Sequence, residues 1–453
     1  MKKRRPGEVG LSKIGTTIGI LGHPWRATVD HGGNISPWDG SPALKWFIAA
    51  EDRWHQPADE IATRQISVGG TPVLETRVRV PQGDVIQRIW VASGREVGPA
   101  VIIEFENDSA RAVAIAVSRG DVVAPRAAHD FGSLPGGGSV EPPSEVVLGL
   151  PLGHRTRVRI GLRCDGDAAK TAHESIDHGE FISRFGDWSD VVRGWTALAE
   201  SASRFVVPDI VNALPIVDVV TSERCQLALD PPVDFGDAIS ARQCLIAWRD
   251  LKRMGLDAPD LESVVSAVEM VARQMKRRGE VSADVALALT SAAYLLRHIE
   301  SEDLATTTEA RSDLIQDLLR VLERATGRNE RSLPQLTAPW VGSPHRVVDQ
   351  LENGLIRWSD QGEATLCPDG LSDSRLGANI EVHGVAVGPE HSVSFALRWH
   401  GALPAVIWEV DGPPGLRLLS GVDPTWSSID ASGEALWRME GPPVAVADAV
   451  SFS

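Results

Sequence analysis

The sequence predicts a multidomain α+β protein of 453 residues. Between about residues 60 and 165, apolar and polar side chains alternate with period two and are divided by turn residues, which is typical of an antiparallel β-sandwich. From about residue 187 the apolar period becomes helical, and after residue 331 short alternating segments return. The predicted domains are an N-terminal β-sandwich (1–180), a central helical hairpin block (187–330) and a C-terminal β-domain (331–453).

Strict alternation and the turns that end it define the strands of the first domain. Residues 73–80 alternate between apolar and polar side chains and stop at Pro81, which begins a turn that also contains Gly83. Proline and glycine end strands because they favour turn conformations. The same reasoning predicts further strands at residues 63–68, 85–92, 100–106, 112–118 and 155–162.

Apolar spacing and helix-end residues define the central block. Asp187 or Ser189 can cap a first helix, and Pro208 fits the first turn of a second. Short loops between the helices predict antiparallel hairpins. Four more helices are predicted at residues 237–254, 259–277, 282–300 and 307–326. In the last domain the clearest strands are predicted at residues 354–359, 378–383, 392–399, 405–410 and 435–439.

The charge balance excludes some classes of partner. Formal net charge is −16, so phosphate-rich nucleic acid and anionic membrane surfaces would be repelled. No apolar run reaches eighteen residues, and no secretory leader follows the basic residues Lys2 to Arg5, so a cytoplasmic location is expected. The four cysteines form no CxxC pair. We therefore expect no zinc site, no redox motif and no cofactor.

Tryptophan is the unusual residue of this chain: 14 Trp stand against 9 Phe and a single Tyr. An indole can fill a core or serve as a stacking surface for a sugar ring. Four tryptophans fall in the polar segment 23–55, which its glycines and prolines mark as a loop. This mixture of rings, carboxylates and hydrogen-bonding groups is what a sugar site needs.

The segment 23–55 supplies the candidate site. Glycoside hydrolysis needs two carboxylates, and the nearest candidates are Asp30, Asp39 and Asp52. The candidate substrate-binding residues are Trp25, Arg26, His31, Asn34, Trp38 and Trp54. The alternative is that Asp30 and Asp39 cap turns beside glycine and that the tryptophans fill the sandwich. No spacing forces the histidines together, so no metal site is expected.

Two other carboxylate clusters have a catalytic and a structural interpretation. Asp234 or Asp237 could stand on a loop at one end of the helices, but Asp237 also fits a helix N-cap. Asp423 lies beside Trp426, where either sugar stacking or a capped turn is possible.

Several segments together resemble the six-hairpin glycosidases. They are residues 70–77 and 103–109, then Val192–Trp195 with Val207–Asp209, and finally residues 397–401 with 404–409. The resemblance implies a leading sandwich, a linker helix, an (α/α)6 toroid and a closing β-cap. A toroid needs about twelve helices and the sequence predicts about six, so a partial toroid is implied, or a ring completed by another chain. The family's acid and base positions are therefore not transferred.

Two functions remain open from the sequence. One is a glycoside hydrolase-like protein that acts on an intracellular glycan or oligosaccharide by carboxylate acid–base chemistry. The other is a non-catalytic carbohydrate-binding or scaffold protein that retains a degenerate glycosidase architecture. In either case a partial toroid would expose apolar helix faces, which favours a homodimer. Two carboxylates roughly 5 to 10 Å apart in an open cleft would favour hydrolysis; carboxylates engaged in turns would not.

Overall fold

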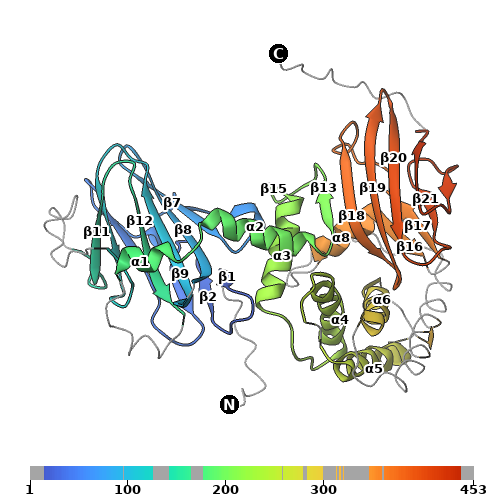
Figure 1. Cartoon of the computed structure of the whole chain (residues 1–453), viewed down its shortest axis with the longest axis horizontal. Coiled ribbons are helices and arrows are strands. Elements are labelled where there is room, and N and C mark those ends of the chain that lie inside the picture. The colour runs from blue at the N-terminus through green and yellow to red at the C-terminus, as the bar shows by residue number, and fades with distance from the viewer. Residues whose placement is uncertain are drawn as a thin grey trace. The chain divides into compact units, whose positions relative to one another are not determined.

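The computed structural model describes residues 15–94, 96–125, 142–164, 177–257, 259–278, 283–298, 313, 316–317, 320, 346–359 and 362–439. The chain divides into two compact units, Met1–Thr196 and Ala197–Ser453 (Figure 1). Antiparallel sheets occur in both units and most helices lie in the second, so the α+β class is confirmed. The first helix of the predicted central block, Trp188–Glu200, lies in unit 1 as far as Thr196, whereas the later helices and the C-terminal strands belong to unit 2.

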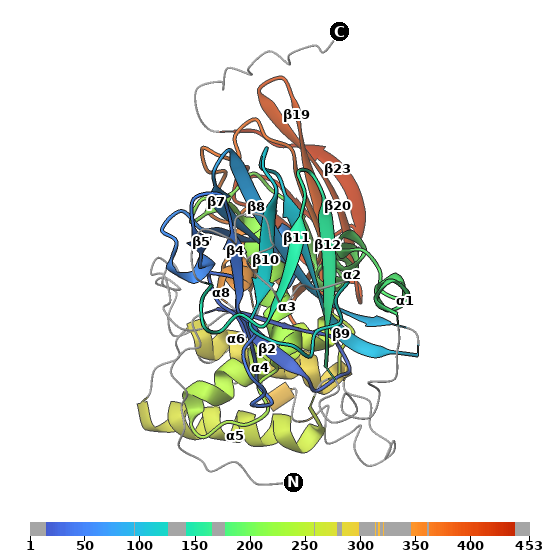
Figure 2. The same cartoon turned by 90° about the vertical axis from the view of Figure 1, so that its left-hand side faces the viewer.

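Unit 1 is built on two antiparallel sheets. One has the order β12-β9-β8-β7-β6 and the other β11-β10-β4-β5; β4, β10 and β11 lie side by side in Figure 2. A small sheet of β1 (Thr16–Gly19), β2 (Arg26–Val29) and β3 (Ile35–Pro37) accompanies them. The remaining bounds are β4 (Trp46–Ala49), β5 (Trp54–His55), β6 (Arg64–Ser67), β7 (Leu74–Val80), β8 (Gly83–Gly94), β9 (Gly98–Asn107), β10 (Val113–Val117), β11 (Leu148–Leu152) and β12 (Arg157–Arg163).

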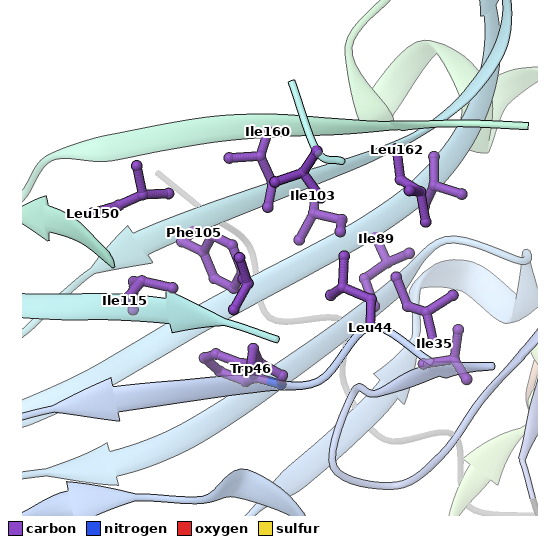
Figure 3. Close-up of a cluster of buried hydrophobic side chains, with 14 of the residues drawn as sticks. Ile35, Leu44, Trp46, Ile89, Ile103, Phe105, Ile115, Leu150, Ile160 and Leu162 are labelled. Carbon is purple, nitrogen blue, oxygen red and sulfur yellow. The ribbon is translucent and has the colours of Figure 1, made fainter. Parts of the chain in front are cut away.

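The core of unit 1 lies between these sheets. Alternation sends every second side chain inward, and Figure 3 shows Trp46, Phe105 and Ile115 among the aliphatic side chains of this core. The rings of Trp46 and Phe105 lie 5.3 Å apart between centroids. The outer face of the five-stranded sheet packs against α1 (His178–Ser183) and the start of α2 (Trp188–Glu200). The predicted strands of this region are confirmed with small shifts at their ends.

Unit 2 combines helices with two sheets. Sheet order is β13-β18-β19-β20-β23 in one and β16-β17-β21-β22 in the other. Their shared core includes Val220 of α3 and Leu351 of α8. The helices are α3 (Ile216–Leu229), α4 (Ala238–Arg253), α5 (Leu261–Arg278), α6 (Ala283–His298) and α8 (Arg346–Leu355). The strands are β13 (Arg204–Val206), β16 (Ile356–Ser359), β17 (Glu363–Leu366), β18 (Ile380–Val387), β19 (His391–His400), β20 (Leu403–Asp411), β21 (Arg417–Ser420), β22 (Ser427–Ser428) and β23 (Ser432–Leu436).

Three expectations about local structure need correction. The polar segment 23–55 is not one loop, because it contains β2 to β5. Pro208 does not begin a helix: residues 210–215 form the hairpin of β14 (Ile210–Val211) and β15 (Leu214–Pro215), and α3 begins at Ile216. Residues Arg346–Leu355 form the helix α8, although strands were expected in the part of the chain after residue 331. Of the helix predicted at 307–326, only residues 313, 316, 317 and 320 are described, and they are helical; the rest lies outside the described residues.

The hairpin of β14 and β15 explains why the helix fails there. Its turn residues Asn212 and Ala213 have φ angles of 51° and 66°, which a right-handed helix does not allow. Left-handed backbone costs roughly 1 to 2 kcal/mol for a residue with a Cβ, and asparagine tolerates it better than alanine. The strain is therefore concentrated at Ala213.

Replacing Ala213 with glycine is expected to stabilise unit 2 by about 0.5 to 1 kcal/mol, because glycine adopts positive φ without a steric cost. Urea unfolding of the full chain measures the change. The matched variant Asn212→Gly should change the free energy of unfolding less. A destabilised Ala213→Gly variant would show that the turn is not strained.

The described helices do not display the ring that the glycosidase resemblance implies. α4, α5 and α6 pack on one another, and α3 packs against α8. None of the helices in the described part of the chain is long and apolar enough to cross a membrane.

Candidate functional site

The turn Asp30–Asn34 is closed by the carboxylate of Asp30. Its Oδ1 accepts hydrogen bonds from the amides of Gly32 and Asn34, both at 2.9 Å, and its Oδ2 accepts one from the side-chain amide of Asn34 at 2.9 Å. Gly33 has a φ of 81°, which favours glycine. Aspartate commonly stabilises a turn in this way. Both carboxylate oxygens of Asp30 are thus engaged within the turn.

Backbone carbonyls of the same turn are fixed by polar side chains from the sandwich. Trp46 donates its indole N–H to the carbonyl of Gly32 at 2.7 Å. Gln65 donates to the carbonyl of Asp30 at 2.7 Å, and Gln87 to that of Gly33 at 3.2 Å. Trp46 and Gln87 are fully buried. The turn is therefore an anchored part of the sandwich interior, and we call residues 30–34 the plug turn.

The neighbouring candidate residues also have structural partners. The guanidinium of Arg26 donates to the carbonyls of Ile20, His23 and Trp25. The ring of Trp25 is buried, whereas that of Trp38 is partly exposed and donates to the hydroxyl of Thr28 at 2.8 Å. His31 lies at the surface with Nε2 at 3.0 Å from the carbonyl of Ala58. This geometry agrees with the structural interpretation weighed from the sequence.

Asp39 caps an exposed turn. Its Oδ1 accepts a hydrogen bond from the amide of Ser41 at 2.9 Å. Slight burial acts to raise its pKa, but hydrogen bonds from Ser41 and Trp25 and the charge of Arg119 outweigh it, so the pKa is lowered. A carboxyl group with a lowered pKa is ionised at neutral pH and does not serve as a general acid there.

Asp52 belongs to a cluster of charged residues around β5 that the sequence did not predict. The imidazole of His55 is buried, with Nε2 at 3.0 Å from Asp52 Oδ1 and Nδ1 at 3.0 Å from Glu60 Oε1. Arg53 donates to both oxygens of Glu60, at 2.6 and 3.1 Å. The pKa of Asp52 is lowered: slight burial opposes this, but the hydrogen bond and charge of His55 prevail. The pKa of Glu60 is lowered chiefly by the hydrogen bond from Arg53.

Trp54 lies on the opposite face of β5 from His55. In the sheet register Trp54 pairs with Ala49, and Ala49 pairs with Ala114. The two alanines are fully buried and the indole of Trp54 packs against them, while Trp54 itself stays partly exposed. We call Trp54 with its neighbours Asp52, Arg53, His55 and Glu60 the β5 corner. It contains a supported ring on one face of β5 and, around His55 on the other face, a group of oriented polar side chains.

The three predicted catalytic carboxylates each have separate partners. Asp30 and Asp39 are committed to separate turns, and Asp52 is bound to His55. The described residues contain no group of three or more His, Cys, Asp and Glu side chains that could hold an ion. Of the predicted residues, the structure joins Asp30 with Asn34 and Asp39 with Trp25, and both Asp52 and Trp54 belong to the β5 corner.

In the two further carboxylate clusters, Asp237 and Asp423 have structural roles. Asp237 is the N-cap of α4 and accepts hydrogen bonds from the amides of Ile239 at 3.0 Å and Ser240 at 2.8 Å. Ser240 completes a capping box, which confirms the capping interpretation. Asp423 accepts from the amides of Thr425 at 3.0 Å and Arg438 at 2.9 Å, so it caps a turn.

Sequence reasoning missed a buried charge cluster in unit 2. Its members come from three helices and are nearly or fully buried: Arg224 on α3, Arg249, Asp250 and Arg253 on α4, and Asp349 and Glu352 on α8. They are far apart in the sequence, which hides the cluster. One signal was present, because charged residues three and four positions apart fall on the same helix face as the apolar stripe.

Comparison with protein-family models, with curated proteins and with solved structures finds no match for this chain. The resemblance to six-hairpin glycosidases stays a prediction, and any function must be argued from the geometry of the chain itself.

Proposed function

We propose that this chain is a non-catalytic carbohydrate-binding protein that contacts its ligand at the β5 corner of unit 1. The observation that carries the proposal is the partly exposed indole of Trp54, supported from beneath by Ala49 and Ala114. A sugar ring stacks on such a flat surface through its C–H face. A supported ring loses little conformational freedom when a ligand binds.

The polar groups that neighbour Trp54 along the chain gather around His55, on the opposite face of β5 from the indole, and they supply hydrogen-bonding groups at the edge of the corner. Asp52 and Arg53 have half-exposed side chains, and each is held in place by another member of the corner, Asp52 by His55 and Arg53 by Glu60. Pre-oriented acceptors and donors of this kind direct hydrogen bonds to a ligand. Asp52 and Glu60 place two carboxylates in the corner, so it has no net positive charge for an anionic glycan and a neutral glycan suits it better.

The hydrolase alternative has less support. Retaining and inverting glycosidases both require one carboxyl group to be protonated as the acid. Asp39 and Asp52 have lowered pKa values, and Asp30 is enclosed in the plug turn. Acid–base chemistry by these three residues therefore lacks its proton donor at neutral pH.

Replacing Trp54 with alanine is expected to weaken glycan binding about tenfold or more, since aromatic anchors dominate such contacts. The measurement is a glycan-array screen of the full chain, followed by calorimetric titration of the best neutral oligosaccharide. The matched control is Trp399→Ala, which removes a partly exposed tryptophan from unit 2.

The control variant should bind as the wild type does, and circular dichroism should show both variants folded. Equal affinity of Trp54→Ala and the wild type would reject the β5 corner as the contact surface. Binding by neither protein to any glycan would reject carbohydrate recognition itself.

A further inference from the structure

The helix α8 is held in unit 2 by charged groups from its neighbours. Glu352 of α8 accepts a hydrogen bond from Ser203 Oγ at 2.9 Å and lies 3.3 Å from Arg224. Arg253 Nη1 lies 3.0 Å from Glu352. Asp349, one turn earlier, accepts from Arg249 at 2.8 Å. All of these contacts join α8 to α3 and α4 or to the segment before α3.

A fourth carboxyl group meets α8 at its first turn. Glu223 of α3 accepts hydrogen bonds from the amides of Val347 at 3.3 Å and Val348 at 3.0 Å. These amides have no partner within the helix. No cation is hydrogen-bonded to Glu223 within the described part of the chain. Glu223 therefore joins the cluster as a carboxyl group bound to neutral donors.

The charges of the cluster do not balance. Among the described residues, three guanidinium groups face four carboxyl groups: Arg224, Arg249 and Arg253 against Glu223, Asp250, Asp349 and Glu352. Asp250 pairs with Arg249 at 3.0 Å. The phenol of Tyr294 on α6 also lies within electrostatic reach of Arg253, Arg249 and Asp250. An uncompensated buried charge is costly, and a buried carboxyl group avoids the cost by keeping its proton.

Glu223 and Asp349 are the two carboxyl groups of the cluster that are placed to keep a proton. Partial burial raises the pKa of Glu223 to about 8 against the hydrogen bonds from the amides of Val348 and Val347, which act to lower it, and repulsion from Asp349 and Asp250 adds to the rise. Burial also raises the pKa of Asp349, with Asp250 and Glu352 reinforcing the effect against the opposing charge of Arg249. Protonation of either member lowers the repulsion on the other, so they titrate as a pair.

We propose that the folded chain holds one exchangeable proton on either Glu223 or Asp349. This proton couples the packing of α8 on α3 and α4 to pH. The folded state holds the proton more tightly than the unfolded chain does. The resulting stabilisation is fully present below the ordinary carboxyl pKa values, and is lost as pH rises toward about 8. α8 therefore packs most firmly in mildly acidic solution and loosens in alkaline solution. This inference is independent of ligand binding at the β5 corner.

The test measures the unfolding equilibrium constant of the full chain in urea from about pH 6 to pH 9, with infrared difference spectra recorded over the same range. One proton held by the folded state raises the unfolding constant of unit 2 by up to tenfold per pH unit. The wild type should also show the carbonyl stretch of a protonated carboxyl group at about pH 6, and lose it by about pH 9. Glu223→Gln and Asp349→Asn should each flatten the pH dependence.

The matched control is Glu262→Gln, which neutralises an exposed carboxylate of α5. This variant should leave both the pH dependence of the unfolding constant and the infrared difference spectrum as in the wild type. The spectrum needs only folded protein, so it decides the question even if one variant is unstable. Absence of a protonated carboxyl band from the wild type at about pH 6, or its persistence in both Glu223→Gln and Asp349→Asn, would overturn the proposal.

Discussion

Replacing Gly33 with alanine is expected to destabilise unit 1 by about 2 to 4 kcal/mol. Gly33 has a φ of 81°, and a Cβ there would stand 2.0 Å from Gln87 Oε1 and 3.0 Å from Thr76 Oγ1. Gln87 is fully buried and donates to the carbonyl of Gly33. The methyl group would therefore force the plug turn out of the sandwich or displace Gln87 from its partner.

The matched control is Gly40→Ala. Gly40 has a φ of 85°, but a Cβ there meets nothing within 4 Å. It should therefore show the backbone strain alone, at about 1 kcal/mol. Denaturant unfolding of both variants separates the two causes. Equal losses would mean that the plug turn is not anchored in the interior of the sandwich.

Replacing Glu352 with alanine is expected to destabilise unit 2 by about 3 to 5 kcal/mol, because it removes one partner from a buried ion network. Glu352 contacts Ser203, Arg224 and Arg253. Its loss leaves the guanidinium groups of Arg224 and Arg253 without this carboxylate, and also that of Arg249, which lies 4.0 Å from it. Thermal and urea unfolding of the full chain measure the effect.

Glu269→Ala provides the comparison on an exposed surface. Glu269 pairs with Arg273 at 2.7 Å, one turn away on α5, and its side chain is 58% exposed. Such a pair contributes about 0.5 kcal/mol or less. If both variants lost the same small amount, the charge cluster would be solvated and would not hold α8 in place.

The sequence predicted the sheet elements best where alternation was long. The segments predicted at 73–80 and 392–399 correspond to β7, which begins one residue later, and to part of β19. Helix ends were also well predicted where a side chain caps the amides, as Asp237 does for α4. Periodicity and capping are local properties, so they can be read without tertiary contacts.

The remaining features depend on contacts between distant residues. Strands β2 to β5 are too short to show alternation, and the glycines of the plug turn made the segment resemble a loop. Pro208 was misread because the positive φ values at Asn212 and Ala213 are not marked by glycine. The partners of Asp52 could not be foreseen, since His55 bridges it to Glu60 only after β5 pairs with β4.

The distinction between local sequence patterns and contacts formed in the fold also applies to the candidate site. The proposed contact surface falls in the region that the sequence pointed to, because Trp54 and His55 of the β5 corner lie at the end of segment 23–55. It could not separate the aspartates that close turns from the tryptophans that stay partly exposed. Burial sets aside Trp25 and Trp46, which lie in the core, and leaves Trp38 and Trp54 partly exposed, of which Trp54 packs on two alanines.

The central claim is that this chain recognises a carbohydrate without converting it. The most direct test incubates the wild-type protein with the neutral oligosaccharide it binds best and follows the ligand by NMR over several hours. We expect reversible line broadening of the sugar signals, reduced in Trp54→Ala, and no new anomeric signals. Accumulation of cleaved product that disappears in Asp52→Asn or Asp39→Asn would contradict the claim and restore the hydrolase alternative.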